Sequence, residues 1–174
     1  MFKSIVVATD GSEHASRALQ LAAELSEKTD AVLHIIYVVD SDISGLPDGL
    51  FEMSKAEHLI NPAPQILTDF KDAHTDALKA AQEAALESQR LVEKLAEHIV
   101  SDAARNARLA GASEVTTSIE NGKPADVVLD YARENNIDAI VTGRRGQGAL
   151  KSLFMGSTSL KIAQNAECTC ITVK

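Results

Sequence analysis

Three glycines in the last third of the chain have the spacing of an anion-binding loop. Gly143 ends an apolar run, Gly146 lies in the short loop that follows, and Gly156 comes directly before Ser157 and Thr158. A glycine lets a ligand approach the backbone closely, and the first N–H groups of a helix have no partner inside the helix. Phosphate oxygens accept hydrogen bonds from N–H groups of both kinds. This part of the sequence therefore predicts a phosphate-binding loop.

A carboxylate near the other end of the chain is the second candidate. Asp10 follows an apolar run at residues 4–9, and Gly11 and Ser12 complete a turn before a helical pattern begins. A carboxylate in such a turn can accept hydrogen bonds from ribose hydroxyls or help to hold a metal ion. The alternative interpretation is that Asp10 serves only as a helix cap, a role for which Ser12 is also suited.

Five short runs rich in Val and Ile are predicted to form the strands that position these turns. They cover residues 4–9, 32–39, 114–120, 139–142 and 169–173. Continuous apolar runs are typical of parallel strands that are covered on both faces, and helical patterns lie between them. This alternation predicts an α/β fold with a doubly wound, five-stranded parallel sheet of strand order 3-2-1-4-5.

The predicted strand order brings the two candidate turns together. In open α/β sheets, ligands bind beyond the carboxyl ends of the strands, at the point where the strand order reverses. That point lies between the first and fourth strands, so Asp10 and the loop at residues 143–146 should face one crevice. The spacing of Gly143 and Gly148 also resembles a P-loop, but Ala149 and Leu150 replace the Lys-Ser/Thr pair that a P-loop requires.

The connection between the second and third strands is longer than this fold needs. Residues 40–64 contain three prolines and two glycines and predict an irregular loop, whereas residues 65–110 contain neither residue type and have helical apolar spacing. One helix of roughly 45 residues would be about 65 Å long, more than one domain needs. We expect a single domain at residues 1–174 with an insertion at about residues 41–85. The insertion is either packed on the domain, which is the simplest case, or forms a separate helix, a projecting extension or a partner-contact surface.

Composition excludes several classes of partner. The chain has 17 basic and 25 acidic residues and a formal charge of −8, which argues against nucleic acid or an anionic membrane as the main partner. No apolar run approaches the roughly 18 residues of a membrane span, and no signal-peptide pattern precedes the first strand. Cys168 and Cys170 suit neither a mutual disulfide nor a zinc site. We expect a cytoplasmic protein without membrane insertion.

The motif Gly143-x2-Gly146-x9-Gly156-Ser157, together with the sequence Val-Ala-Thr-Asp-Gly-Ser that ends at Ser12, resembles the ATP-binding branch of the universal stress protein family. The resemblance covers nearly the whole chain. It implies the adenine-nucleotide alpha-hydrolase-like, Rossmann-like sandwich of that family. It also implies a homodimer formed by the last strand, residues 169–173, whose edge would otherwise be unpaired.

The same resemblance implies which residues hold ATP, with Mg²⁺ as the accompanying ion. Asp10, directly after Thr9, would contact the ribose or the metal ion beside the phosphates, and Val38 would present backbone groups to adenine. Arg145 lies where relatives often carry a basic residue or histidine, so its side chain either approaches the phosphates or points to water. The residues expected around the nucleotide are Thr9, Asp10, Val38, Gly143, Arg145, Gly146, Gly156, Ser157 and Thr158.

Three functions remain open at the level of sequence. The first is a nucleotide-dependent regulatory or stress-response dimer with a protein client, in which ATP is hydrolysed slowly or not at all. The second is a slow ATPase or nucleotidyl-transfer enzyme, although no general base or nucleophile is evident. The third is a nucleotide-independent protein-interaction module that acts through the insertion.

Overall fold

The computed structural model describes the backbone of residues 1–40, 64–146 and 155–174, and within the longest helix it describes side chains from residue 83 onward, except 85 and 89. The elements of these parts follow one another as β1 (Ser4–Ala8), α1 (Glu13–Thr29), β2 (Val32–Asp40), α3 (Pro64–Leu109), β3 (Val115–Gly122), α4 (Pro124–Glu134), β4 (Ala139–Gly143), α5 (Ser157–Asn165) and β5 (Thr169–Val173).

The strands form one parallel sheet of order β3-β2-β1-β4-β5, which confirms the predicted topology. The central strand β1 pairs with β2 on one side and β4 on the other, so that Ala8 lies opposite both Ile36 and Thr142. These central strands are buried on both faces, which explains their unbroken runs of Val and Ile.

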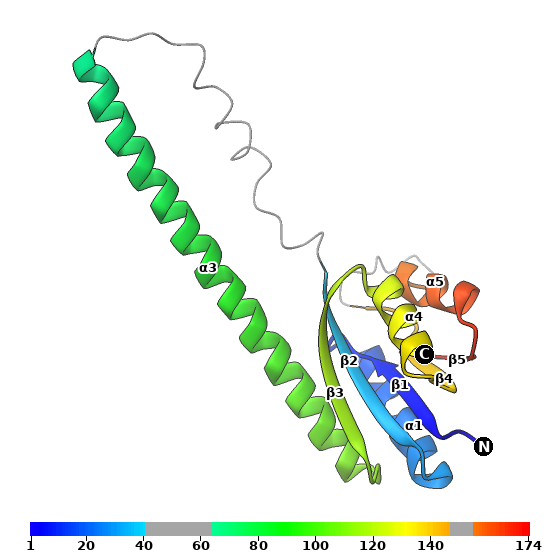
Figure 1. Cartoon of the computed structure of the whole chain (residues 1–174). Coiled ribbons are helices and arrows are strands. Elements are labelled where there is room, and N and C mark those ends of the chain that lie inside the picture. The colour runs from blue at the N-terminus through cyan, green and yellow to red at the C-terminus, as the bar shows by residue number, and fades with distance from the viewer. Residues whose placement is uncertain (41–63, 147–154) are drawn as a thin grey trace. The chain divides into compact units, whose positions relative to one another are not determined.

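Helices cover the two faces of this sheet (Figure 1). On one face, Ala18 and Ala22 of α1 and Ala103 and Ala107 of α3 pack against strand residues such as Val7. On the other face, the cluster consists of residues from α4, α5, the strands and the connection before β4: Val6, Ile36, Ala125, Val128, Leu129, Ala132, Ile137, Ile140 and Ile162. Because side chains alternate along a strand, residues of one β-strand contribute to both clusters.

The first helix begins and ends at residues that suit helix termini. The side chain of Ser12, the N-cap residue, accepts a hydrogen bond from the backbone N–H of Ala15, as the sequence predicted. The C-cap residue Asp30 has a φ of 56°, the left-handed conformation that ends many helices. This fixed start matters for the site because it sets the position of the preceding Asp10.

The long crossover contains one uninterrupted helix of 46 residues, α3. The role of the insertion predicted at about residues 41–85 stays a prediction. The chain divides into two compact units, one made of residues 1–42 and 95–174 and the other of residues 43–94. In the first unit, Ala96 and Val100 of α3 are buried. The irregular loop predicted up to residue 64 falls mostly on residues 41–63, outside the described residues.

Within the parts described, no helix is both long and apolar enough to cross a lipid bilayer.

Candidate functional site

The turns that follow β1 and β4 lie against each other. A Cβ atom placed on Gly146 would be 2.5 Å from Oδ2 of Asp10, so the carboxylate lies directly beside this glycine. The hydroxyl of Ser12 also donates a hydrogen bond to the backbone oxygen of Arg145 over 3.4 Å. The structure therefore brings together the two turns that the strand order predicted to share a crevice.

Local hydrogen bonds fix the turn after β1. The N–H of Thr9 donates to the backbone oxygen of Ile36 at 3.0 Å, which holds the end of β1 against β2. The N–H of Gly11, which has a φ of 78°, donates to the Thr9 hydroxyl at 3.3 Å. The N–H of Ser12 donates to Oδ1 of Asp10 at 3.0 Å. These bonds orient the Asp10 carboxylate before any ligand arrives.

The loop after β4 is equally constrained. A Cβ atom on Gly143 would lie 2.7 Å from the carbonyl carbon of His14, so only glycine lets the start of α1 approach β4 this closely. The N–H of Arg144 donates to the backbone oxygen of Val173 at 2.6 Å. The carbonyl of Arg144 accepts from the N–H of Gly156 at 2.9 Å. The last bond joins the two ends of the glycine motif.

The start of α5 has the open N–H groups that an anion needs. Its N-cap residue is Gly156, which has no side chain to accept a hydrogen bond from the first turn of the helix. Ser157 and Thr158 are the first residues of the helix, where N–H groups have no helical acceptor and the helix dipole favours negative charge. The start of α1 differs because the Ser12 side chain already bonds the N–H of Ala15. Of these two helix starts, α5 is the better anion site.

The structure places nearly all the predicted residues around these contacts. Those on the two turns and at the start of α5 are Thr9, Asp10, Gly143, Arg145, Gly146, Gly156, Ser157 and Thr158. Val38 is half-buried in β2, two residues beyond Ile36, and packs beside the cluster that α4 and α5 cover. Burial, and secondly the charge of Asp10, raise the pKa of Tyr37, so its phenol remains protonated at neutral pH. The roles of the predicted residues toward a ligand stay predictions.

Two serines hold the site together in ways that the sequence did not reveal. Ser12 was predicted as a cap, but it also links α1 to the glycine loop through Arg145. Ser159 was not singled out, although its buried hydroxyl donates to the carbonyl of Gly143 over 2.6 Å and ties the first turn of α5 to β4. The only signal for Ser159 was a hydroxyl residue in the first turn of a helix that follows a glycine loop.

Some buried polar atoms on the segments around the two turns lack hydrogen-bond partners. Among the described residues, the buried side-chain atoms that lack a hydrogen-bond partner include Nδ1 of His14, Oγ1 of Thr142 and Nε of Arg144. Buried polar groups are rarely left unsatisfied, and exceptions call for an explanation such as a functional role. All three residues lie within the first turn of α1 or at the end of β4, which is where a ligand is predicted.

Mg²⁺ fits this site only together with a phosphate ligand. Among the residues described, no three His, Cys, Asp or Glu side chains come together as a metal site. Mg²⁺ commonly takes one or two carboxylates, with waters and substrate phosphates completing the shell. Asp10, oriented beside Gly146, would supply the carboxylate, and the nucleotide would supply the phosphate oxygens.

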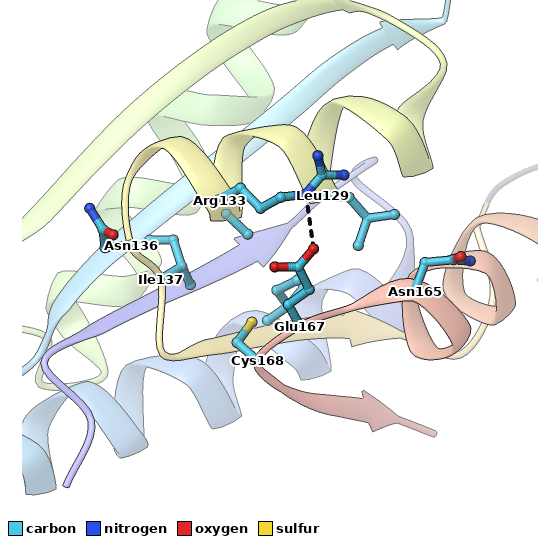
Figure 2. Close-up of a pocket in the computed structure, with 9 residues that line it drawn as sticks. Leu129, Arg133, Asn136, Ile137, Asn165, Glu167 and Cys168 are labelled. Atoms are coloured by element: carbon cyan, nitrogen blue, oxygen red, sulfur yellow. Dashed lines mark ion pairs between the residues drawn. The ribbon is translucent and has the colours of Figure 1, made fainter.

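A separate cavity of about 390 Å³ lies elsewhere, between α4, α5 and the start of β5 (Figure 2). Arg133 and Glu167, whose charged atoms are 3.8 Å apart, lie across it. The lining residues are Leu129, Ala132, Arg133, Asn136, Ile137, Ile140, Asn165, Glu167 and Cys168. Ile140 is near the amino end of β4, and Cys168 directly precedes β5, so this cavity is at the amino ends of the strands and not at the carboxyl ends, where the predicted crevice lies.

The fold defines a doubly wound α/β protein in which the turns after β1 and β4 lie against each other. The model of the universal stress protein family matches residues 1–174, so the protein belongs to that family. The universal stress protein YxiE of Bacillus subtilis (strain 168) is 27% identical over 180 residues, which cover 100% of both chains.

Solved structures support the same fold. The structure of hypothetical protein MJ0577 superposes with a TM-score of 0.72 at 18% identity, covering 100% of this chain and 96% of that chain. A universal stress protein from Archaeoglobus fulgidus, solved in complex with dAMP, gives a TM-score of 0.57 at 19% identity, covering 99% and 98% of the two chains. The dAMP complex shows that a protein of this fold binds an adenine nucleotide.

Proposed function

We propose that this protein binds ATP, accompanied by Mg²⁺, in the crevice between β1 and β4. The observation that carries the proposal is the contact of the Asp10 carboxylate with Gly146, next to the uncapped start of α5. Backbone N–H groups at Ser157 and Thr158 would receive phosphate oxygens, and Asp10 would contact the ribose or the metal ion. The dAMP complex of the Archaeoglobus fulgidus relative supports an adenine nucleotide as the ligand.

ATP occupancy would act as a signal in a homodimer paired through β5. In the sheet, β5 is an edge strand, which leaves one side of its backbone available for pairing. Nucleotide changes assembly or binding to a protein client only if the alternative states have different affinities for it. We place this regulation in the cytoplasm, as part of a stress response.

Calorimetric titration tests the binding step. Purified protein, freed of carried-over nucleotide, is titrated with ATP, as are Asp10→Ala and Gly156→Val. We expect both variants to lose affinity. A Cβ on Gly156 would meet Arg144 oxygen at an ordinary 3.5 Å, so valine should obstruct ligand approach more than folding. The exposed residue Asp130 provides the matched control, Asp130→Ala, which should bind as the wild type does. Absence of binding at millimolar ATP, with an intact circular dichroism spectrum, would reject the proposal.

A slow ATPase is the second candidate because Asp10 is positioned to hold a metal ion beside the phosphates. Single-turnover ATP cleavage that disappears in Asp10→Ala would favour this enzyme, whereas unchanged ATP after hours favours binding alone. Binding of a client by the insertion, with equal strength in the presence and absence of ATP, would instead favour an interaction module.

A further inference from the structure

The side-chain hydroxyl of Thr142 makes no hydrogen bond with the described parts of the fold. Thr142 is 3% exposed and lies one residue before the glycine that ends β4, opposite Ala8 of β1. Its hydroxyl is buried and has no hydrogen-bond partner among the residues that the structure describes. Burying a hydroxyl without a partner costs stability, and valine would fill nearly the same volume without this cost. The fold alone therefore gives no reason for a hydroxyl here.

The position of Thr142 indicates which part of a nucleotide it would meet. Side chains alternate along β4, so Thr142 is on the same sheet face as Ile140, a member of the cluster under α4 and α5. Val38, at the end of β2, packs beside that cluster as well. Val38 is the residue expected beside adenine, and it shares this sheet face with Thr142, whereas the phosphates are expected farther on, at Gly146 and Gly156. Thr142 is thus placed toward the nucleoside end of the crevice.

We infer that the Thr142 hydroxyl is a specificity-determining contact for the nucleoside part of the ligand, an inference that rests on the nucleotide binding proposed above. The hydroxyl can donate to a base nitrogen or accept from a ribose hydroxyl or an exocyclic amine. Because it is covered in this structure, the contact forms only as the entering nucleoside displaces the groups that cover it. Binding of phosphate groups alone does not involve it.

The test compares Thr142→Val with Thr142→Ser in two measurements. ATP and inorganic tripolyphosphate, which lacks a nucleoside, are each titrated calorimetrically, and thermal unfolding is followed without ligand. We expect Thr142→Val to weaken ATP binding about two- to tenfold, the range of one lost hydrogen bond. Its tripolyphosphate affinity should be unchanged and its melting temperature equal to or above that of the wild type. Thr142→Ser keeps the hydroxyl and should retain ATP affinity.

Thr117→Val on β3 makes the same substitution at an exposed position and serves as the control. Equal ATP affinity of wild type and Thr142→Val overturns the inference, as does equal weakening of ATP and tripolyphosphate. If Thr142→Val does not fold, Thr142→Ala provides a second hydroxyl-free variant under the same criteria. Failure of the wild type to bind ATP would instead reject the proposed function itself, so the two failures are distinguishable.

Discussion

At the scale of single residues, the glycines of the motif have different physical reasons to be glycine. Gly143 is required by the approach of the α1 backbone, whereas Gly156 has space for a small side chain in the structure. We predict that Gly143→Ala destabilises the protein by about 1–3 kcal/mol, the usual range for overpacking, while Gly156→Ala changes stability little. Urea unfolding of both variants measures the difference, and equal stabilities would contradict the assigned role of Gly143.

Asp138 gives the site's scaffold a dependence on pH. The backbone N–H groups of Lys3 and Ser4 donate to Oδ2 of Asp138 at 2.6 and 3.1 Å and lower its pKa below the ordinary value of 3.8. A lowered pKa in the folded state means that the ionised carboxylate stabilises the fold above the ordinary pKa, and that this contribution is lost as pH falls through the lowered one.

We therefore predict that Asp138→Asn lowers the melting temperature at neutral pH because the amide carries no charge to attract these N–H groups. The difference from the wild type should shrink as the pH falls below 3.8. Thermal unfolding followed by circular dichroism across this range checks it. A difference that stays constant from neutral to acidic pH would show that ionisation of Asp138 does not contribute.

At the scale of elements, the attachment of α5 to the sheet decides whether the crevice is preformed. The buried bond from Ser159 to the carbonyl of Gly143 holds the first turn of α5 over the end of β4. Ser159→Ala should cost about 1 kcal/mol, because it removes one hydrogen bond and leaves a buried carbonyl unpaired. This corresponds to a loss of roughly 2–4 °C in melting temperature for a chain of this size. Ser16→Ala, at an exposed serine in α1, is the control, and equal melting temperatures for the two variants would contradict the role of Ser159.

Much of the arrangement of strands and helices was predictable from the sequence. The apolar runs identified all five strands, and the reason is clearest for β1 and β4, which are buried on both faces, whereas β3 and β5 are partly exposed. The order of the strands placed Asp10 near Gly146. Contacts between distant segments, such as Ser159 with Gly143, depend on helix placement and left no periodic signal. The extent of α3 was also ambiguous, because helical spacing alone does not say whether residues 65–110 form one helix or two.

At the scale of the whole molecule, the backbone of β5 determines whether two copies can pair. The N–H of Thr169 donates to the backbone oxygen of Asp138, and the backbone oxygen of Val173 accepts from the N–H of Arg144. The backbone hydrogen-bonding groups of every second residue, counted from Thr169, therefore face the rest of the sheet. Backbone groups of Cys170 and Thr172 consequently face the open edge. Proline is tolerated on edge strands where its missing N–H would point outward.

We predict that Thr172→Pro converts the proposed homodimer to a monomer without unfolding it. Thr172→Val, which keeps the N–H group, should remain dimeric. Sedimentation equilibrium of wild type and both variants at matched concentrations measures the mass in solution. A monomeric wild type, or a dimer that survives Thr172→Pro, would show that β5 is not the pairing edge.

The central claim is that the turns after β1 and β4 form a nucleotide site, and native mass spectrometry tests it most directly. Freshly purified protein is sprayed before and after addition of ATP with Mg²⁺, and the Gly156→Val variant is treated in the same way. The account predicts one ATP bound to each wild-type chain and a strongly reduced bound fraction in the variant. Folded wild-type protein that carries no nucleotide even at millimolar ATP would contradict it.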